Sequence, residues 1–485
     1  MSDQSIIEAI HPGLDIPQYR LFHDAYMGGS YWDANRYLFR HRLEDAQDHD
    51  DRIKRSVYMN KAREVVDAHI ARLFANDWQV TTADGGAVDE TIMTDADRAG
   101  TGFWEFVQSA TTWADILRFV LVVVDVPSAP DAPASLESAI AAGVRPYLSW
   151  HTPQSLVNFQ LGPDGKFKWA VIGEEVDESE IIIKDGLPFA SAKPIRQRRL
   201  WTPEYWVTYR ETNNRWERYA DGEHPVGMVP IVPLRLFQGP GNFLSSLSRL
   251  EDIAPLQVAL FNLYSLLYEI LHQQTFGQLV IQADPADLVR GAGENETPKS
   301  VLRGFGATRA MLMPKDSTIP PQYISPPGHN VLSLQSEIKE TQARIDELGT
   351  NDAGQRGETP GESGLAKLIG WQSTEAVLKH NFRNIADAFE MALHISDRWL
   401  GRDTEYTIQQ PTRFGFADPY VLLQYTDAQL RLYTDKALRA RIYLRAIQEH
   451  FPEIKADEAS AIAERQANES TAGDPFAMPQ QGGEF

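Results

Sequence analysis

The sequence predicts an α+β protein in which two long helices are joined by a glycine-rich loop. Residues 330–348 and 365–400 repeat apolar side chains at helical spacing. Residues 147–236 instead contain short strand-like runs separated by turn residues. Between the two helices, residues 349–364 read GTNDAGQRGETPGESG, and their five glycines disfavour regular structure. Since helix connections usually need only about 2–8 residues, we expect this loop to be functional or disordered.

Length and composition limit the classes of protein to which this chain can belong. A length of 485 residues predicts about two to four domains, and 42 % hydrophobic content is enough for large cores. The absence of cysteine excludes disulfides, thiolate metal sites and cysteine nucleophiles, and fits folding in a reducing cytosol. Residues 1–13 lack the pattern of a signal peptide. Residues 252–271 are long enough for a membrane span but carry several polar and charged side chains, so we expect a buried helix and no membrane segment.

The remaining elements follow from local patterns. We expect an acidic turn at 44–51, a helix over 53–74, helical stretches at 103–110 and 113–119, and a strand at 121–126. Within the strand-rich block we expect strands at 157–160, 167–172, 181–184, 198–209 and 216–220, with a hairpin turn at Asn213 and Asn214. Further on we expect a helix at 247–274, short strands at 278–282, 301–303 and 310–313, a strand pair at 406–409 and 413–416, helices at 427–451 and 458–468, and a disordered tail at 471–485.

Two groups of side chains stand out as surface features. An apolar seam with 3-4-3-4-3 spacing runs along the predicted helix 330–348 and consists of Val331, Leu334, Ile338, Thr341, Ile345 and Leu348. A basic cluster lies on the predicted helix 427–451 and consists of Arg431, Lys436, Arg439, Arg441 and Arg445. A merely solvated face is the alternative interpretation of this cluster.

Motifs for catalysis are missing. The sequence contains no P-loop, no H-E-x-x-H and no G-x-S-x-G, and its histidines lack the spacing of metal ligands. A carboxylate pair for glycoside chemistry stays open because acidic residues are abundant, but nothing singles one out. We therefore expect no enzyme activity, no cofactor and no metal site.

The order of these elements resembles the portal protein of tailed double-stranded DNA bacteriophages. Residues 52–74, RIKRSVYMNKAREVVDAHIARLF, look like the portal helix through which the chain enters the ring body. Residues 227–237, GMVPIVPLRLF, followed by a polar turn and the helix 247–274, are similar to the segment that leads into the portal stem. Residues 349–371, a polar glycine loop running into a long helix, look like the portal tunnel loop. The resemblance covers most of the chain and lies in element order more than in residue identity.

The resemblance implies a domain organisation. It places a wing at 1–245 and 365–425, stem helices at 246–275 and 328–349, a clip at 276–327, a tunnel loop at 350–364, a helical crown at 426–470 and a disordered tail at 471–485.

The resemblance also implies a function. Such a chain forms a ring of about twelve copies at one capsid vertex, through which the terminase packages DNA that is later ejected, and the ring docks the neck and tail. The expected partners are further copies of the chain, double-stranded DNA, the terminase large subunit, the major capsid protein, a head-completion adaptor and a scaffolding protein. The location would be the virion, after assembly in the host cytoplasm. A net charge of −21 per chain suits a channel wall that repels phosphates and lets DNA slide, with solubility alone as the alternative interpretation.

Individual residues acquire roles by the same resemblance. Asn351, Gln355 and Arg356 would touch DNA from the tunnel loop, with a flexible linker as the alternative. Lys299 and Arg303 would contact the terminase or the adaptor from the clip. The seam would pack against neighbouring subunits, and the basic cluster would face packaged DNA. Two rival functions stay open, a different virion structural protein such as an adaptor or minor capsid component, and a carboxylate-dependent enzyme acting on carbohydrate.

Overall fold

The computed structural model contains two compact units, each of which is described by itself. It describes residues 3–14, 18–82, 88–127, 145–177, 180–184, 187–191, 194–275, 278–282, 310–313, 320, 322–324, 329–349, 364–411, 414, 426–427, 429–433, 435–450 and 454–469. The larger unit comprises Met1–Asn351 and Leu378–Thr412, and the smaller unit comprises Asp352–Val377 and Arg413–Phe485. With 53 % helix and 21 % strand among the described residues, the mixture confirms the α+β class. Short helices α1 (Asp3–Glu8), α2 (Gln18–Met27), α3 (Ala34–Tyr37) and α6 (Glu90–Thr94) complete the larger unit.

The helix expected over 53–74 is in fact two helices, α4 (Ala46–Arg55) and α5 (Lys61–Leu73). The expectation of an acidic turn at 44–51 was therefore wrong. Each helix begins at a capping side chain, because the carboxylate of Asp45 accepts from the N–H of Gln47 and the amide of Asn60 accepts from the N–H of Arg63. The acidic run is the first part of α4 rather than a loop.

A three-stranded antiparallel sheet forms the centre of the larger unit. Its order is β11 (Ile231–Leu234), β2 (Val120–Asp125) and β3 (Tyr147–His151), and every residue of β2 is buried. The stretches expected at 103–110 and 113–119 form one helix, α7 (Phe103–Leu117), which packs against β2 and β11. Burial along the whole strand explains why residues 120–124 are all apolar, and the buried Asp125 that follows them pairs with Arg199.

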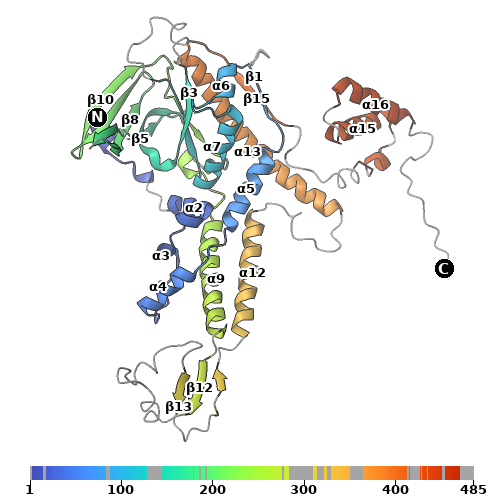
Figure 1. Ribbon diagram of the computed structural model, residues 1–485. Helices are drawn as coiled ribbons and strands as arrows, with labels where there is room; N and C mark the ends of the chain where they lie inside the picture. Colours follow the sequence, from blue (N-terminus) through green and yellow to red (C-terminus); the bar gives the residue numbers. More distant parts are fainter. Residues whose placement is uncertain are drawn as a thin grey trace, which may run out of the picture. The chain divides into compact units, whose positions relative to one another are not determined.

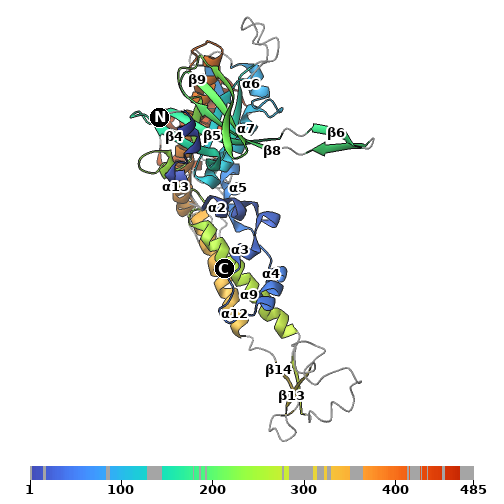
Figure 2. The same ribbon diagram turned by 90° about the vertical axis from the view of Figure 1, so that its left-hand side faces the viewer.

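A five-stranded antiparallel sheet lies beside it, with the order β10-β9-β8-β5-β4 (Figures 1 and 2). Its strands are β4 (Leu156–Leu161), β5 (Phe167–Asp177), β8 (Pro194–Trp201), β9 (Tyr205–Thr212) and β10 (Arg215–Glu223), and a separate hairpin pairs β6 (Glu180–Lys184) with β7 (Leu187–Ser191). Positive φ angles of 51° and 60° at Asn213 and Asn214 confirm the hairpin turn between β9 and β10.

The single strand expected at 198–209 was wrong, because a tight turn divides it into β8 and β9. The hydroxyl of Thr202 accepts a hydrogen bond from the N–H of Tyr205 at 3.0 Å. The backbone N–H of Thr202 donates to the carbonyl of Tyr205 at 2.9 Å. Pro203 follows Thr202 and has no N–H to offer a strand partner.

The strand at 406–409 exists as β15 (Tyr406–Gln409), whereas its expected partner at 413–416 lies outside the described residues except for Phe414. Strand β15 pairs antiparallel with β1 (Gln79–Thr82), and no other strand joins this sheet within the described part of the chain. A strand far earlier in the sequence takes the partner position, which local pattern cannot predict.

Two long helices, α9 (Ile253–Thr275) and α12 (His329–Gly349), run side by side in opposite directions (Figures 1 and 2). Between them in the sequence comes a small sheet of β12 (Gln278–Gln282), β13 (Ala310–Met313) and β14 (Gln322–Ile324), in the order β13-β12-β14. The strand expected at 301–303 lies outside the described residues. The helix expected from 247 begins six residues later, because Leu247 forms a β-bridge with Phe237.

Helix α9 is a core helix of the larger unit. Among the described residues, Ile253–His272 is the one segment long and apolar enough to cross a membrane by length and composition. Its polar side chains nevertheless bind the protein itself. The amide of Gln257 accepts from two backbone N–H groups at the start of α5 (3.0 and 3.2 Å), and Asn262 binds the backbone of Tyr37 and Phe39 at 2.9 Å each.

The smaller unit contains α15 (Lys436–His450) packed against α16 (Ala456–Glu469). The continuous helix expected over 427–451 was wrong. Helical residues reach position 432, and α15 then begins anew because the carboxylate of Asp435 accepts from the N–H of Leu438 at 3.0 Å.

Candidate functional site: the anchors of the glycine-rich segment

The apolar seam on α12 is partly used within the chain. Ile338 and Ile345 are buried in the main core, whereas Leu348 is 45 % exposed. Val331 and Leu334 are half-buried and pack against the same core. The centre of the seam therefore holds α12 on α9 and α5, and its end at Leu348 stays accessible in the isolated chain.

One face of α5 fixes the last turn of α12, directly before the glycine-rich segment. Lys61 and Val65 lie one helical turn apart on α5. The ammonium of Lys61 lies 3.3 Å from the carboxylate of Asp346. A Cβ built on Gly349 would come closer than 3.0 Å to both methyl groups of Val65. Only a glycine lets the two helix backbones approach this closely.

The same face of α5 also fixes the helix that follows the segment, α13 (Gly364–Trp399). His69 lies one turn after Val65, and the buried amide of Asn381 donates to its Nε2 at 3.2 Å. Burial, with Arg249 and Arg72 nearby, holds the pKa of His69 well below its usual value, so the imidazole is neutral and can accept this bond.

Further contacts hold α13 in the larger unit. The buried side chains on this helix include Leu378, Phe382, Ile385 and Phe389. The ring of Phe382 meets that of Trp78 edge-on, with 4.7 Å between the ring centroids. Helix α12 is thus bound to α5 at its last turn, directly before the glycine-rich segment. Helix α13 is bound to α5 at Asn381, whereas its residues 364–377 belong to the smaller unit. Residues Asn351, Gln355 and Arg356 of the glycine-rich segment lie outside the described residues, as do Lys299 and Arg303 of the expected clip.

Sequence reasoning did not find the α5 face. A spacing of four links Lys61, Val65 and His69, and this was the signal available. Their partners are up to 312 residues away in the sequence, so the pattern by itself does not say what the face binds.

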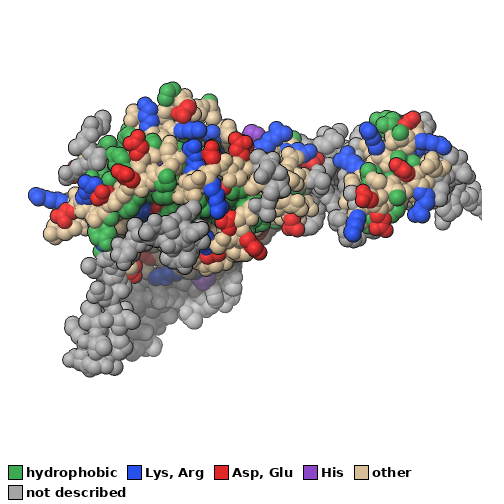
Figure 3. All heavy atoms as spheres, turned by 90° about the horizontal axis from the view of Figure 1, so that it is seen from above, with side chains coloured by type: hydrophobic (Ala, Val, Ile, Leu, Met, Phe, Trp, Pro, Cys, Tyr) green, Lys and Arg blue, Asp and Glu red, His purple; other side chains and the backbone are tan. Residues whose placement is uncertain are grey.

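The basic cluster sits on the smaller unit. Arg431 pairs with Asp427 at 2.9 Å, Lys436, Arg441 and Arg445 are exposed, and Arg439 is half-buried. A cavity of about 380 Å³ between α15 and α16 is lined by Lys436 and Arg441 together with Glu464. On these helices, at the right of Figure 3, basic and acidic side chains are interspersed. The face of these helices seen in Figure 3 is therefore mixed in charge rather than uniformly basic.

A buried ion pair joins α7 to the segment before α9. The guanidinium of Arg249 lies 2.6 Å from the carboxylate of Asp115, and their side chains are 4 % and 0 % exposed. Burial raises the pKa of Asp115, whereas Arg249 opposes this rise. One oxygen of Asp115 and one terminal nitrogen of Arg249 have no hydrogen-bond partner within the described part of the chain.

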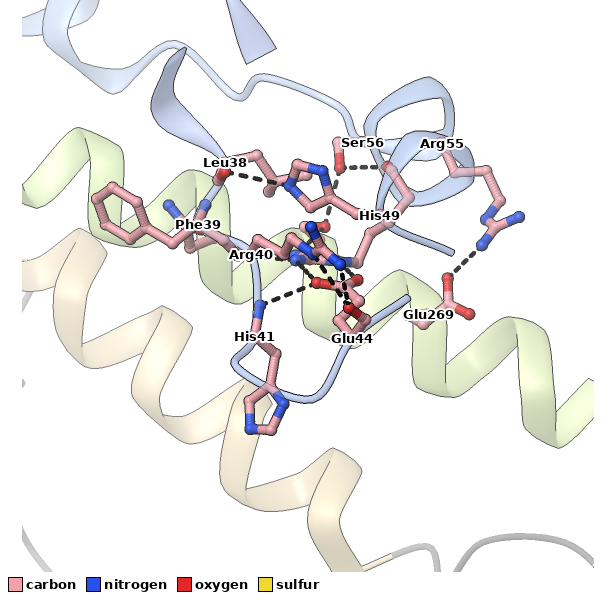
Figure 4. A network of polar contacts seen from close by, with 12 residues as sticks. Leu38, Phe39, Arg40, His41, Glu44, His49, Arg55, Ser56 and Glu269 are labelled. Atoms are coloured by element: carbon pink, nitrogen blue, oxygen red, sulfur yellow. Dashed lines mark hydrogen bonds and ion pairs between the residues drawn. The ribbon is translucent and has the colours of Figure 1, made fainter. Parts of the chain in front are cut away.

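A second buried pair clamps the N-terminal segment onto α9 (Figure 4). The Nε and Nη2 atoms of Arg52 each lie 2.7 Å from one carboxylate oxygen of Glu44. Arg52 also donates to the carbonyl of Phe39 at 2.7 Å and to the hydroxyl of Ser265 on α9 at 3.3 Å. The bonds from Arg52 lower the pKa of Glu44 to about 2.

The polar contact nearest to a catalytic arrangement involves Ser149 and His151 on β3. The hydroxyl lies 3.2 Å from Nε2 of the imidazole, and burial lowers the pKa of His151.

The cavities of about 380 and 770 Å³ lie away from this pair, between α15 and α16 and around the end of β10. Across the described residues, no group of three or more metal-ligating side chains could hold a metal ion.

Replacing Gly349 with alanine is expected to lower the free energy of unfolding by about 1–3 kcal/mol, because the new methyl group overlaps Val65. Alanine favours helix over glycine by about 1 kcal/mol, so a loss would show that packing outweighs propensity. Urea unfolding of Gly349→Ala, of Val65→Ala and of the double variant measures the coupling energy between the two positions. We expect the second substitution to relieve the first by about 0.5–3 kcal/mol. Strictly additive effects would show that the two residues do not limit each other.

Comparison with models of known protein families and with curated proteins finds no match for this chain. Solved structures similar to it come from gene transfer agent (GTA) particles. A chain of the neck of an empty GTA particle, computed with C6 symmetry, is 12 % identical over 88 % of this chain and 92 % of that chain, with a TM-score of 0.39. A chain from the virion of a native GTA particle is 12 % identical over 79 % and 89 %, with a TM-score of 0.37. A chain of the native neck, computed with C12 symmetry, is 13 % identical over 79 % and 89 %, with a TM-score of 0.36. With TM-scores below 0.5, these similarities establish neither the fold nor the function of this chain.

Proposed function

We propose that this chain is a portal protein, the ring-forming subunit of a DNA channel at one vertex of a phage-like capsid. The single observation that supports it best is the attachment of both helices flanking the glycine-rich segment to one face of α5. A polar segment that follows a helix end fixed in this way begins at a constant place in the larger unit, which a simple linker does not require.

The paired helices α9 and α12 are consistent with a stem, and the small sheet between them in the sequence with a clip. At 1.5 Å per residue, a helix of 21 residues such as α12 would line roughly 30 Å of a channel. The exposed end of the seam at Leu348 is available for a neighbouring copy. In this proposal the wing, clip and crown keep the boundaries expected from the sequence.

The chemistry of the channel follows from charge. Twelve copies at −21 each would carry a total near −250, which repels DNA phosphates and prevents adhesion. Asn351, Gln355 and Arg356 would then make transient contacts with DNA from the tunnel loop, and Lys299 and Arg303 would meet the terminase or adaptor. The chain would supply no ATP site, so the terminase motor would provide the energy by hydrolysing ATP.

Measuring the particle mass by light scattering, with negative-stain imaging of the same fraction, tests the proposal. Twelve chains of 54.6 kDa would give a particle of about 0.65 MDa with an axial hole. A ring of this kind that also supports DNA packaging favours a portal over an adaptor. A monomer or dimer at all concentrations, with and without a scaffolding protein, would contradict it and return attention to the enzyme alternative.

Arg356→Ala is expected to reduce the yield of packaged DNA several-fold while leaving the mass of the ring unchanged. The reason is that an arginine facing the channel contacts phosphates without contributing to subunit contacts. DNA recovered from nuclease-treated particles measures the yield. Arg215→Ala, which removes an equal charge from the exposed start of β10, is the matched control. Equal losses for both variants would show that overall charge rather than the loop is responsible.

A further inference from the structure

A groove surrounds the end of the edge strand β10 and has no role in the proposed channel. Its volume is about 770 Å³, which is in the size range of ligand sites. It is formed by the turn before β9, by the last residues of β10 and by the segment that follows, all within the larger unit. The lining combines two aromatic rings, Tyr205 and Trp206, with the charged side chains of Glu204, Arg218, Asp221 and Glu223.

The charge of the groove is acidic and only partly compensated. Arg218 pairs with Asp221 at 2.9 Å. Glu204 and Glu223 form no ion pair with any residue that the structure describes. Two carboxylates therefore remain available to a cation, and the aromatic rings of Tyr205 and Trp206 lie in the same groove.

An unsatisfied buried acceptor lies in the same groove wall. His224 is only 7 % exposed, and its Nε2 lies 2.8 Å from the carbonyl of Thr202, so this nitrogen carries the proton and donates. Burial lowers the pKa of His224, which keeps the ring neutral and leaves Nδ1 as an acceptor. This Nδ1 atom has no hydrogen-bond partner among the described residues. The described chain alone therefore leaves this buried acceptor unsatisfied.

The groove follows a sheet edge. Among the described strands, β10 pairs only with β9 in the five-stranded sheet, so no described strand occupies its outer side, where an extended chain could bind. Gly222, opposite Trp206, has no side chain, and a Cβ there would come within 3.0–3.1 Å of the indole. A substituent at this position would press on the ring that lines the groove.

We propose that this groove binds an extended, lysine-containing segment of a partner protein. A lysine ammonium would donate to Glu204 and Glu223, its methylene stem would lie along the aromatic rings, and the segment would run beside β10. The inference does not depend on the channel function, because it concerns a surface formed by β9, β10 and the residues around them.

Binding of a fluorescein-labelled Gly-Lys-Gly-Lys-Gly peptide to the full chain, followed by anisotropy, tests this proposal. Two further peptides replace lysine with norleucine or with glutamate. We expect the lysine peptide to bind at least about tenfold more tightly than either, a difference of about 1.4 kcal/mol. The advantage should shrink between about 25 mM and about 300 mM salt, because partly exposed charges are screened.

The variant Glu204→Gln with Glu223→Gln should weaken lysine-peptide binding about tenfold or more. Glu90→Gln with Glu405→Gln is the matched control, since these two exposed glutamates lie outside both the groove and β10. Equal loss in the control would show that the chain's net charge of −21 attracts the peptide without a site. Equal affinity for the lysine and norleucine peptides, or no binding of the lysine peptide, would also overturn the proposal. Circular dichroism checks that each variant is folded.

Discussion

Replacing Arg249 with methionine is expected to lower the free energy of unfolding of the larger unit by about 3–5 kcal/mol, because it leaves the carboxylate of Asp115 buried without a counter-charge. Methionine keeps much of the length of the side chain, so the loss of charge is the main change. The pKa of Asp115 is already raised by burial, and it would rise further in this variant. Urea unfolding followed by tryptophan fluorescence measures the loss.

The pH dependence of this variant has a definite sign. A carboxyl group whose pKa is higher in the folded than in the unfolded chain favours folding as the pH falls, because the folded state binds the extra proton. The deficit of Arg249→Met should therefore be largest near pH 7 and smaller in mildly acidic solution. A deficit that grows on acidification would contradict this account.

The double variant Asp115→Leu with Arg249→Met separates charge from packing. A buried ion pair replaced by apolar side chains of similar size is often neutral or stabilising, so we expect most of the lost stability to return. If the double variant is as unstable as the single one, the loss comes instead from packing, for example the contact of the Arg249 guanidinium with the ring of Phe237 at 5.2 Å.

Replacing Arg52 with methionine is expected to cost a similar 3–5 kcal/mol and to act mainly on the N-terminal segment. Arg52 satisfies both carboxylate oxygens of Glu44 and bonds Phe39 and Ser265, so its loss releases residues 38–56 from α9. Amide hydrogen exchange of these residues should become much faster, while exchange in the central sheet should change less.

Acid should act on this clamp in the opposite direction from its effect on Asp115. The pKa of Glu44 lies at about 2 in the folded chain, below its ordinary value of 4.5, so the contribution of Glu44 to stability is complete above about pH 4.5 and is lost as the pH falls towards 2. In Arg52→Met the pKa of Glu44 should return towards 4.5, so this acid dependence of stability should largely disappear.

Lys54→Met is the matched control for the clamp. Lys54 lies two residues from Arg52 and pairs with Asp51, but their side chains are 70 % and 41 % exposed. We expect its stability to change by no more than about 0.5 kcal/mol. A comparable loss in both variants would mean that helix α4 is sensitive to any charge removed from it, and that the buried bonds of Arg52 are not special.

The sequence by itself determined the elements whose signals are local. The helices expected at 330–348 and 365–400 appear as α12 (His329–Gly349) and α13 (Gly364–Trp399), because apolar periodicity is a property of neighbouring residues. The turn at Asn213 and Asn214 is likewise fixed by two residues that tolerate positive φ. The interruptions before Lys61 and Lys436 were missed, although Asn60 and Asp435 are common capping residues.

Only the tertiary structure decided what these elements bind. The bond between His69 and Asn381 joins residues 312 apart, and the pairing of β1 with β15 joins strands at residues 79–82 and 406–409. Arg52 and Arg249 look like surface residues in a sequence, since charged side chains are rarely buried, and only their carboxylate partners make burial tolerable. Such contacts depend on which distant segment packs nearby, and a local pattern carries no information about that partner.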